Sequence, residues 1–215
     1  MKFKSRVHAA RLLAERLRAT YRNKNPLVLA VPRGAVLMAK IIAEALGGEL
    51  DVVLVHKLGH PDQPELAIGA IDESGHAFVS EWAADLDPEF LETEKQRQLA
   101  LLRERRAKYT PLRAPIDPRG RIVIVVDDGI ATGSTMTAAL RAIRAQKPKK
   151  LVVAVAVASP QAARAMLREC DAMVCLNMPL EFYAVGQFFE DFEQVTDEDV
   201  VAILKKEQAN MSAVG

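Results

Sequence analysis

The chain has 215 residues, of which 50% are hydrophobic and 27% are charged, and its formal net charge is +1. This length suits one domain of generous size, or one domain with a small appendage. The near-zero net charge gives no argument, at the level of the whole chain, for a surface that binds nucleic acid or a membrane. The chain starts without the apolar core of a signal peptide, and its longest apolar run, residues 151–158, is far too short to span a bilayer. We therefore expect a cytoplasmic protein.

The first part of the chain alternates between helical and strand patterns. Apolar residues at helical spacing predict an amphipathic helix over 5–19, and the apolar run at 27–31 predicts a buried strand that Pro32 ends. A helix is expected over 34–47, and a second buried strand over 51–58.

The middle of the chain is more irregular. Prolines, glycines and alternating apolar residues over 59–80 predict a mobile loop and then a hairpin that turns at residues 73–75. A long charged helix covers 88–108, and a proline-rich stretch ends it. The remaining elements are expected as a strand over 121–127, a helix over 134–146, a strand over 150–158, a helix over 160–169, a strand over 172–176, an irregular aromatic stretch over 179–194 and a final helix capped by Thr196.

The strands consist of continuous valine, isoleucine and leucine, and they alternate with helices. This order predicts an α/β fold with a parallel central sheet and helices on both faces. Ligands of such sheets bind beyond the carboxyl ends of the strands, where Pro32, Lys57 and Asp127 are expected.

The stretch "RIVIVVDDGIATGSTMTAAL", residues 121–140, places acidic and hydroxyl side chains at one of these strand ends. Asp127 and Asp128 follow the apolar run, and glycines and hydroxyl residues lead into the next helix: Gly129, Thr132, Gly133, Ser134 and Thr135. A helix N-terminus with free amides and nearby hydroxyls is an anion site.

The two aspartates would repel a bare phosphate, so they need hydroxyl donors or a metal. A vicinal diol close to a phosphate would suit both the aspartates, which accept hydrogen bonds from the hydroxyls, and the turn, which binds the phosphate. A ribose 5-phosphate has this structure. The lysine of a Walker A loop and the glycine pattern of a dinucleotide fingerprint are both absent. The alternative interpretation is a solvated acidic turn in which the hydroxyls merely cap a helix.

The segment "VIVVDDGIATGST", residues 123–135, resembles the phosphoribosyl-diphosphate motif of the type I phosphoribosyltransferases. Residues 30–36 resemble the first loop of that family, residues 57–71 stand in the place of its flexible catalytic loop, and residues 179–200 resemble the C-terminal segment of a bacterial subgroup of predicted phosphoribosyltransferases. The resemblance implies one domain over 1–215, with a core to about residue 178 and a small hood and C-terminal helix over about 179–208.

The resemblance implies a glycosyltransferase of nucleotide and nucleoside metabolism that uses phosphoribosyl diphosphate (PRPP). It would transfer ribose 5-phosphate to a nitrogenous base and release pyrophosphate, with Mg²⁺ held mainly by the substrate near Asp127 and Asp128 rather than by direct protein ligands. The alternative is a regulatory protein that binds PRPP without turnover. The expected partners are small molecules, with no nucleic acid and no membrane, and the family is compatible with a homodimer.

The resemblance also assigns residues. Arg33, Lys57 and Glu65 are the expected catalytic residues, and the expected PRPP-binding residues are Arg33, Gly34, Asp127, Asp128, Gly129, Ile130, Ala131, Thr132, Gly133, Ser134 and Thr135. A cis peptide is expected near Arg33. Because Ala131 stands where 6-oxopurine enzymes carry an aspartate, the motif is similar to the adenine and orotate branches.

Two further clusters stay open at this stage. Arg103, Arg105 and Arg106 form either a solvated face of the long helix or a group of which one member reaches the diphosphate. Phe182, Tyr183 and Phe188 form either core and interface or part of a hood over the acceptor base.

Overall fold

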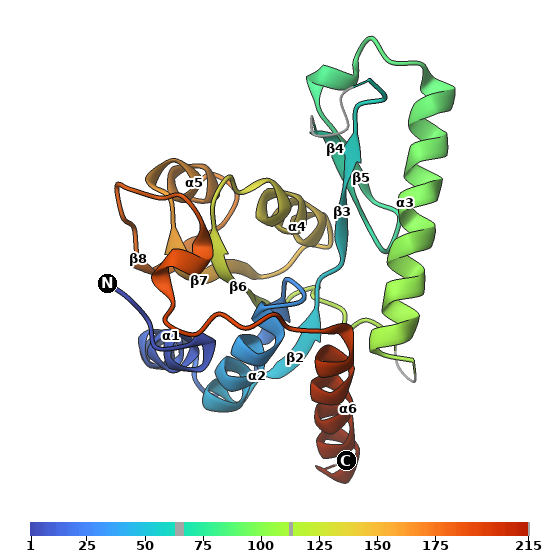
Figure 1. The fold of residues 1–215 in the computed structure, drawn as a ribbon. Coiled ribbons are helices and arrows are strands. Elements are labelled where there is room, and N and C mark those ends of the chain that lie inside the picture. The colour runs from blue at the N-terminus through green and yellow to red at the C-terminus, as the bar shows by residue number, and fades with distance from the viewer. Residues whose placement is uncertain (63–66, 112–113, 215) are drawn as a thin grey trace.

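The computed structural model describes residues 1–62, 67–111 and 114–214. Its central sheet has five parallel strands in the order β2-β1-β6-β7-β8 (Figure 1). These strands are β1 (Leu27–Ala30), β2 (Glu49–Val52), β6 (Ile122–Ile130), β7 (Lys150–Ala158) and β8 (Ala172–Asn177). The predicted α/β fold with a parallel sheet is confirmed.

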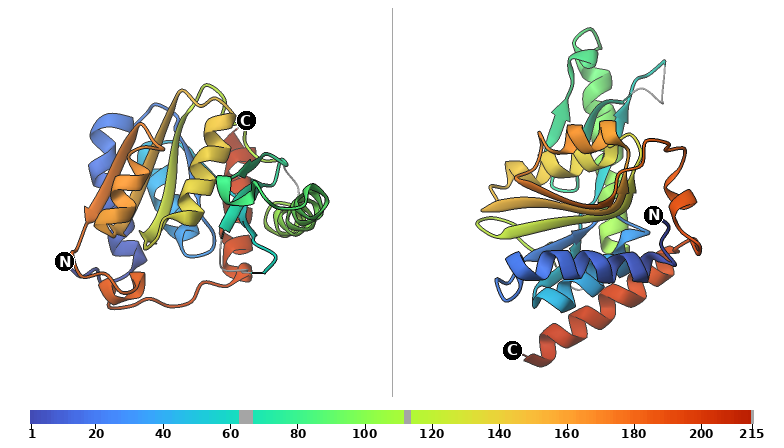
Figure 2. Two further views of the ribbon diagram at one scale, coloured as in Figure 1. Left: turned by 90° about the horizontal axis from the view of Figure 1, so that it is seen from above. Right: turned by 90° about the vertical axis from the view of Figure 1, so that its left-hand side faces the viewer.

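Helices cover both faces of this sheet (Figure 2). The helices α1 (Arg6–Tyr21) and α2 (Ala35–Leu46) lie on one face, and α4 (Ser134–Ala145) and α5 (Pro160–Met166) lie on the other. Successive residues of β6 enter opposite cores, with Ile124 on the side of α1 and α2 and Val125 on the side of α4 and α5. Burial on both faces explains why the strands are continuously apolar rather than alternating.

A second, antiparallel sheet and a long helix form an arm that projects from the core (Figure 1). The arm consists of β3 (Val55–Gly59), β4 (Ala67–Asp72), β5 (Ala77–Val79), the short 3₁₀ helix η1 (Glu81–Ala83) and α3 (Pro88–Tyr109). The predicted hairpin is confirmed, since β4 pairs with β5 across a turn in which Gly75 has a φ of 90°.

The prediction of one strand over 51–58 was wrong. The chain leaves the central sheet after Val52, where Val53 N still donates to Ala30 O at 3.0 Å, and it enters the arm at Val55. Val53 and Leu54 are both buried at the junction. Since the apolar run continues through this change of sheet, hydrophobicity alone does not show the break.

The prediction that β6 ends at Asp127 was also wrong, because this strand continues to Ile130. The neighbouring strand β7 is long enough to pair with Gly129 and Ile130, so the ladder extends past the acidic pair. Asp127 and Asp128 therefore lie within the last part of the strand.

The C-terminal part of the chain runs from β8 back across the sheet to α6 (Asp197–Val214), with the short η2 (Val185–Phe188) on the way (Figure 1). The predicted cap is confirmed, since Asp199 N donates to Thr196 Oγ1 at 3.2 Å and Thr196 N donates to Asp199 Oδ2 at 2.9 Å. None of the helices in the described part of the chain is long and apolar enough to cross a membrane.

Candidate active site

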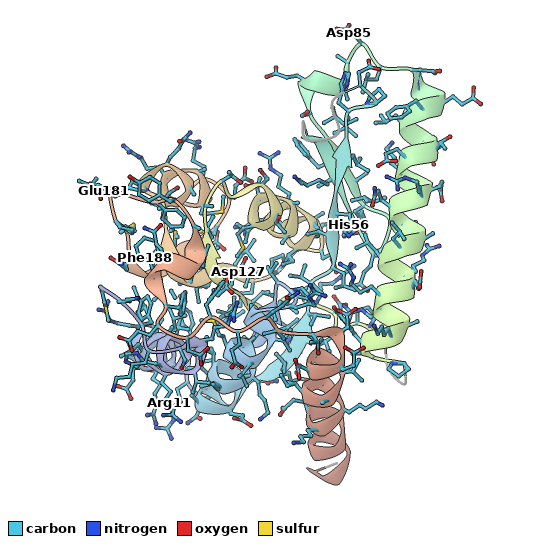
Figure 3. All side chains as sticks on the ribbon, viewed as in Figure 1. Arg11, His56, Asp85, Asp127, Glu181 and Phe188 are labelled. Atoms are coloured by element: carbon cyan, nitrogen blue, oxygen red, sulfur yellow. The ribbon has the colours of Figure 1, made fainter. Side chains whose placement is uncertain are left out.

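The acidic pair lies at the carboxyl end of β6, near the middle of the molecule (Figure 3). Asp127 accepts a hydrogen bond on Oδ1 from the amide of Asp128 at 2.8 Å. Burial, followed by the negative charge of Asp128, raises the pKa of Asp127 well above its usual range. The pair is therefore an electrostatically costly arrangement, of the kind that is common at functional sites.

The turn after the pair presents free backbone amides to solvent. Gly133 adopts a φ of 86° and precedes α4, and no side chain caps this helix. The residues of the turn that lie exposed are Ala131, Thr132, Ser134 and Thr135. Uncapped amides at the positive end of a helix dipole, with hydroxyls beside them, can hold a phosphate.

Gly129 lies at the point where this turn meets the C-terminal segment. A Cβ on Gly129 would lie 2.6 Å from Val185 Cγ1 and 2.7 Å from Val157 Cγ1. The space on this side of β6 is therefore already filled, and only glycine fits here without displacing its neighbours.

The turn between β1 and α2 lies against the acidic pair. The peptide between Pro32 and Arg33 is cis, as expected. A Cβ on Gly34 would lie 2.5 Å from Asp128 Oδ2, so the backbone of this turn approaches the carboxylate closely. The Arg33 side chain is 45% exposed, and its Nη1 lies 3.7 Å from Asp197 Oδ1 at the start of α6.

Arg6, at the first position of α1, joins this cluster, and the sequence interpretation missed it. Its Nε donates to Asp128 Oδ2 at 2.8 Å, and its Nη2 lies 2.8 Å from the same oxygen. One local signal existed: a cation at the N-terminus of a helix opposes the helix dipole. An arginine directly after the cap Ser5 therefore indicates a tertiary partner.

The remaining predicted catalytic residues are less closely placed. Lys57 was expected at the carboxyl end of a strand of the parallel sheet, and this was wrong: it is an exposed residue in the middle of β3 in the arm, opposite Ala70 of β4. Its neighbour His56 contacts Gln98 of α3, with Nδ1 2.5 Å from Oε1. Glu65 lies outside the residues that the structure describes.

Asp197 connects three parts of the molecule. Tyr109 Oη at the end of α3 donates to its Oδ1 at 2.6 Å, and Lys108 Nζ donates to its Oδ2 at 3.0 Å. These donors lower the pKa of Asp197, the hydrogen bond from Tyr109 most of all. The start of α6 is thereby tied both to the arm and to Arg33.

For Arg106 the structure contradicts both sequence interpretations, a solvated position and a diphosphate contact. Its guanidinium is buried and donates to Asp51 Oδ1 and to the carbonyl oxygen of Val52, each at 2.8 Å, and it is also paired with Glu73. Arg106 therefore joins α3 to the end of β2 and to the hairpin turn. Arg103 and Arg105 are exposed.

The aromatic stretch divides between core and surface. Phe188 is buried, and its ring centroid lies 5.2 Å from that of Phe182, whereas Tyr183 is 84% exposed. Further along, the ring of Phe192 lies 3.8 Å from the guanidinium carbon of Arg6. The stretch therefore lies beside two neighbours of the acidic pair, with Val185 next to Gly129 and Phe192 next to Arg6.

Fold and site together define an α/β protein whose polar residues gather around the carboxyl end of the parallel strand β6. A family model described as a phosphoribosyl transferase domain matches residues 4–191. Because this match covers most of the chain, the chain belongs to the family of phosphoribosyl transferase domains.

Two groups of relatives agree with this assignment. The chain is 38% identical over 216 residues to a protein of Mycobacterium tuberculosis (strain H37Rv) that bears the name "Putative phosphoribosyl transferase Rv0571c", with 99% of this chain and 48% of the relative covered. The chain thus spans about half the length of the curated relatives it matches. The crystal structure of TT1426 from Thermus thermophilus is 44% identical, covers 96% of this chain and 99% of its own, and superposes with a TM-score of 0.88.

Proposed function

We propose that the protein transfers ribose 5-phosphate from PRPP to a nitrogenous base and releases pyrophosphate. In this reaction the bond from C1 of the sugar to the diphosphate breaks, and a bond from C1 to a base nitrogen forms. The observation that carries the proposal is the acidic pair at the end of β6 beside the uncapped N-terminus of α4. One side of this site suits a diol, and the other suits a phosphate.

Different residues of the site bind different parts of the substrate. Asp127 and Asp128 accept hydrogen bonds from the ribose hydroxyls, and the turn over 129–135 holds the 5′-phosphate. Gly34 lets the β1–α2 turn approach the sugar closely, and the exposed Arg33 reaches the diphosphate when it leaves Asp197. Positioning and charge stabilisation of this kind suffice for the reaction, because the protein need not supply a covalent nucleophile.

Lys57 and Glu65 complete the proposed catalytic set. Lys57 is exposed in the middle of β3, the strand that precedes the connection to β4, and would stabilise the charge of the departing pyrophosphate. Glu65 would order that connection over the bound sugar. Exclusion of water matters here, because water would otherwise hydrolyse the activated sugar.

The donor set fits magnesium held mainly by the substrate. The site offers the hard carboxylate oxygens that Mg²⁺ prefers, and the described residues contain no group of three or more His, Cys, Asp or Glu that would form a metal site by itself. Magnesium, when bound, would neutralise charge on the diphosphate.

The test is pyrophosphate release from PRPP and Mg²⁺ in the presence of a panel of nitrogenous bases. We expect release with one base, and about ten- to a hundredfold less with Asp128→Asn, since a charged hydrogen bond contributes about 1.5–3 kcal/mol. Asp85→Asn is the matched control, because Asp85 is an exposed acid at the tip of the arm (Figure 3). PRPP binding without release from any base would instead support the regulatory alternative.

A further inference from the structure

The guanidinium of Arg6 lies between the acidic pair and the C-terminal segment of the chain. On one side it contacts Asp128, with Nε and Nη2 each 2.8 Å from Oδ2. On the other side its Nη1 donates to the carbonyl oxygen of Glu193 at 2.6 Å, and its plane lies over the ring of Phe192 at 3.8 Å from the centroid. Among the residues that the structure describes, no other cation forms an ion pair with Asp128.

Arg6 contacts one carboxylate oxygen of Asp128, Oδ2, through two of its nitrogens. Both nitrogens of the fork converge on Oδ2, whereas no basic side chain in the described part of the chain donates to Oδ1. The side chains of Arg6 and Asp128 are each only 13% exposed, so water screens this pair weakly. Arg6 therefore holds the Asp128 carboxylate in one orientation through Oδ2.

The close packing around Arg6 makes this orientation hard to change. A Cβ on Gly34 would lie 3.0 Å from Arg6 Nε as well as 2.5 Å from Asp128 Oδ2, so the backbone of the β1–α2 turn closes the third side of the pair. Lysine could not reproduce the arrangement, because its ammonium is a point charge without a planar fork.

From these contacts we infer that Arg6 is a positioning residue that sets recognition of the sugar hydroxyls and couples it to the segment over 189–194. This inference rests on the proposed function. Arg6 orients Asp128 so that its second oxygen accepts a hydrogen bond from the ribose diol. Because the same guanidinium holds Glu193 and Phe192, occupation of the diol site stabilises the C-terminal segment that borders it.

The experiment compares two sugars that differ in one hydroxyl, ribose 5-phosphate and 2-deoxyribose 5-phosphate, by calorimetry in the presence of Mg²⁺. In the wild-type protein we expect ribose 5-phosphate to bind about tenfold more tightly, the value of one charged hydrogen bond. In Arg6→Gln this ratio should fall to about two. Arg11 is an exposed arginine of the same helix, so Arg11→Gln is the control and should keep the wild-type ratio of affinities.

The ratio of the two sugar affinities distinguishes a positioning role of Arg6 from a merely structural one. If Arg6 only stabilised the fold, Arg6→Gln would weaken the binding of both sugars by the same factor, and that result would overturn the inference. Arg6→Lys keeps the charge but loses the fork, and we expect an intermediate ratio. If Arg6→Gln does not fold, the lysine variant decides, and a wild-type ratio there would also overturn the inference.

Hydrogen exchange tests the coupling. Ribose 5-phosphate should slow amide exchange over 189–194 at least threefold in the wild-type protein and in Arg11→Gln, but not in Arg6→Gln. Equal slowing in all three proteins would refute the coupling. A wild-type protein that binds neither PRPP nor ribose 5-phosphate would refute the proposed function itself. Normal binding with an unchanged hydroxyl ratio in the variants would refute only the role of Arg6.

Discussion

Replacement of Arg106 tests whether this arginine is a structural residue of the arm or a substrate contact. In Arg106→Gln the carboxylates of Asp51 and Glu73 lose their shared cation, and the carbonyl oxygen of Val52 loses its donor. Removal of one partner from a buried ion pair costs about 3–5 kcal/mol, and we expect about 3 kcal/mol here because the Arg106 side chain keeps 10% exposure.

For a chain of this size, a loss of about 3 kcal/mol lowers the melting temperature by about 6–12 °C. Thermal unfolding followed by circular dichroism measures this difference directly. Arg103→Gln is the matched control, since Arg103 is an exposed arginine of the same helix and its replacement should change stability by less than about 0.5 kcal/mol. Equal melting temperatures of the two variants at neutral pH would refute the structural role.

The pH dependence of the same variant gives a second test. Burial raises the pKa of Glu73, and the hydrogen bond and charge of Arg106 act against this rise. Without Arg106 the pKa of Glu73 in the folded protein rises further. A carboxyl whose folded pKa exceeds its unfolded pKa contributes stability that is present at low pH and is lost as the pH rises through the folded pKa. The deficit of Arg106→Gln should therefore be largest at neutral pH and shrink on acidification, and a deficit that is constant or grows towards acid would contradict this explanation.

Two further substitutions probe the surroundings of the site. Gly129→Ala should lower the free energy of unfolding by about 1–3 kcal/mol, because the new Cβ would overlap Val185 and Val157. In thermal unfolding, the additional substitution Val185→Ala should restore part of this loss. An unchanged melting temperature of Gly129→Ala alone would show that the neighbouring side chains move aside without cost. Tyr109→Phe should cost roughly 1 kcal/mol, because Asp197 loses a hydrogen bond that lowers its pKa. A carboxyl whose pKa is lowered in the folded protein contributes stability that is present above its unfolded pKa and is lost as the pH falls through its folded pKa. Tyr109→Phe should therefore lose less stability than the wild-type protein on acidification below about pH 4. If the melting temperatures of the two proteins fall in parallel over this pH range, the hydrogen bond from Tyr109 to Asp197 does not contribute as proposed.

The sequence by itself determined the parallel sheet, the arm hairpin, the cap of α6 and the phosphoribosyltransferase family. Each of these depends on residues that are near neighbours in the chain. The pattern that suggested a diol and a phosphate occupies thirteen consecutive positions, 123–135, and the strand, the acids and the helix N-terminus follow one another directly.

The position at which the chain changes sheets depended on tertiary structure. Val52 and Val55 belong to different sheets, yet the residues between them are buried, so the apolar pattern has no gap. The extension of β6 past Asp127 depends in the same way on the length of its partner β7. A strand ends where its neighbour stops pairing, and a single segment does not encode the length of its neighbour.

Tertiary structure also decided which arginines matter and in what way. Arg6 meets Asp128 across 122 positions of the chain, and Arg106 meets Asp51 across 55. A basic residue on a helix usually faces solvent, and only the packing of another element can enclose it with a carboxylate. The identity of these pairs follows from how the helices and the arm pack around the sheet, and this packing brings together charges that the sequence keeps far apart.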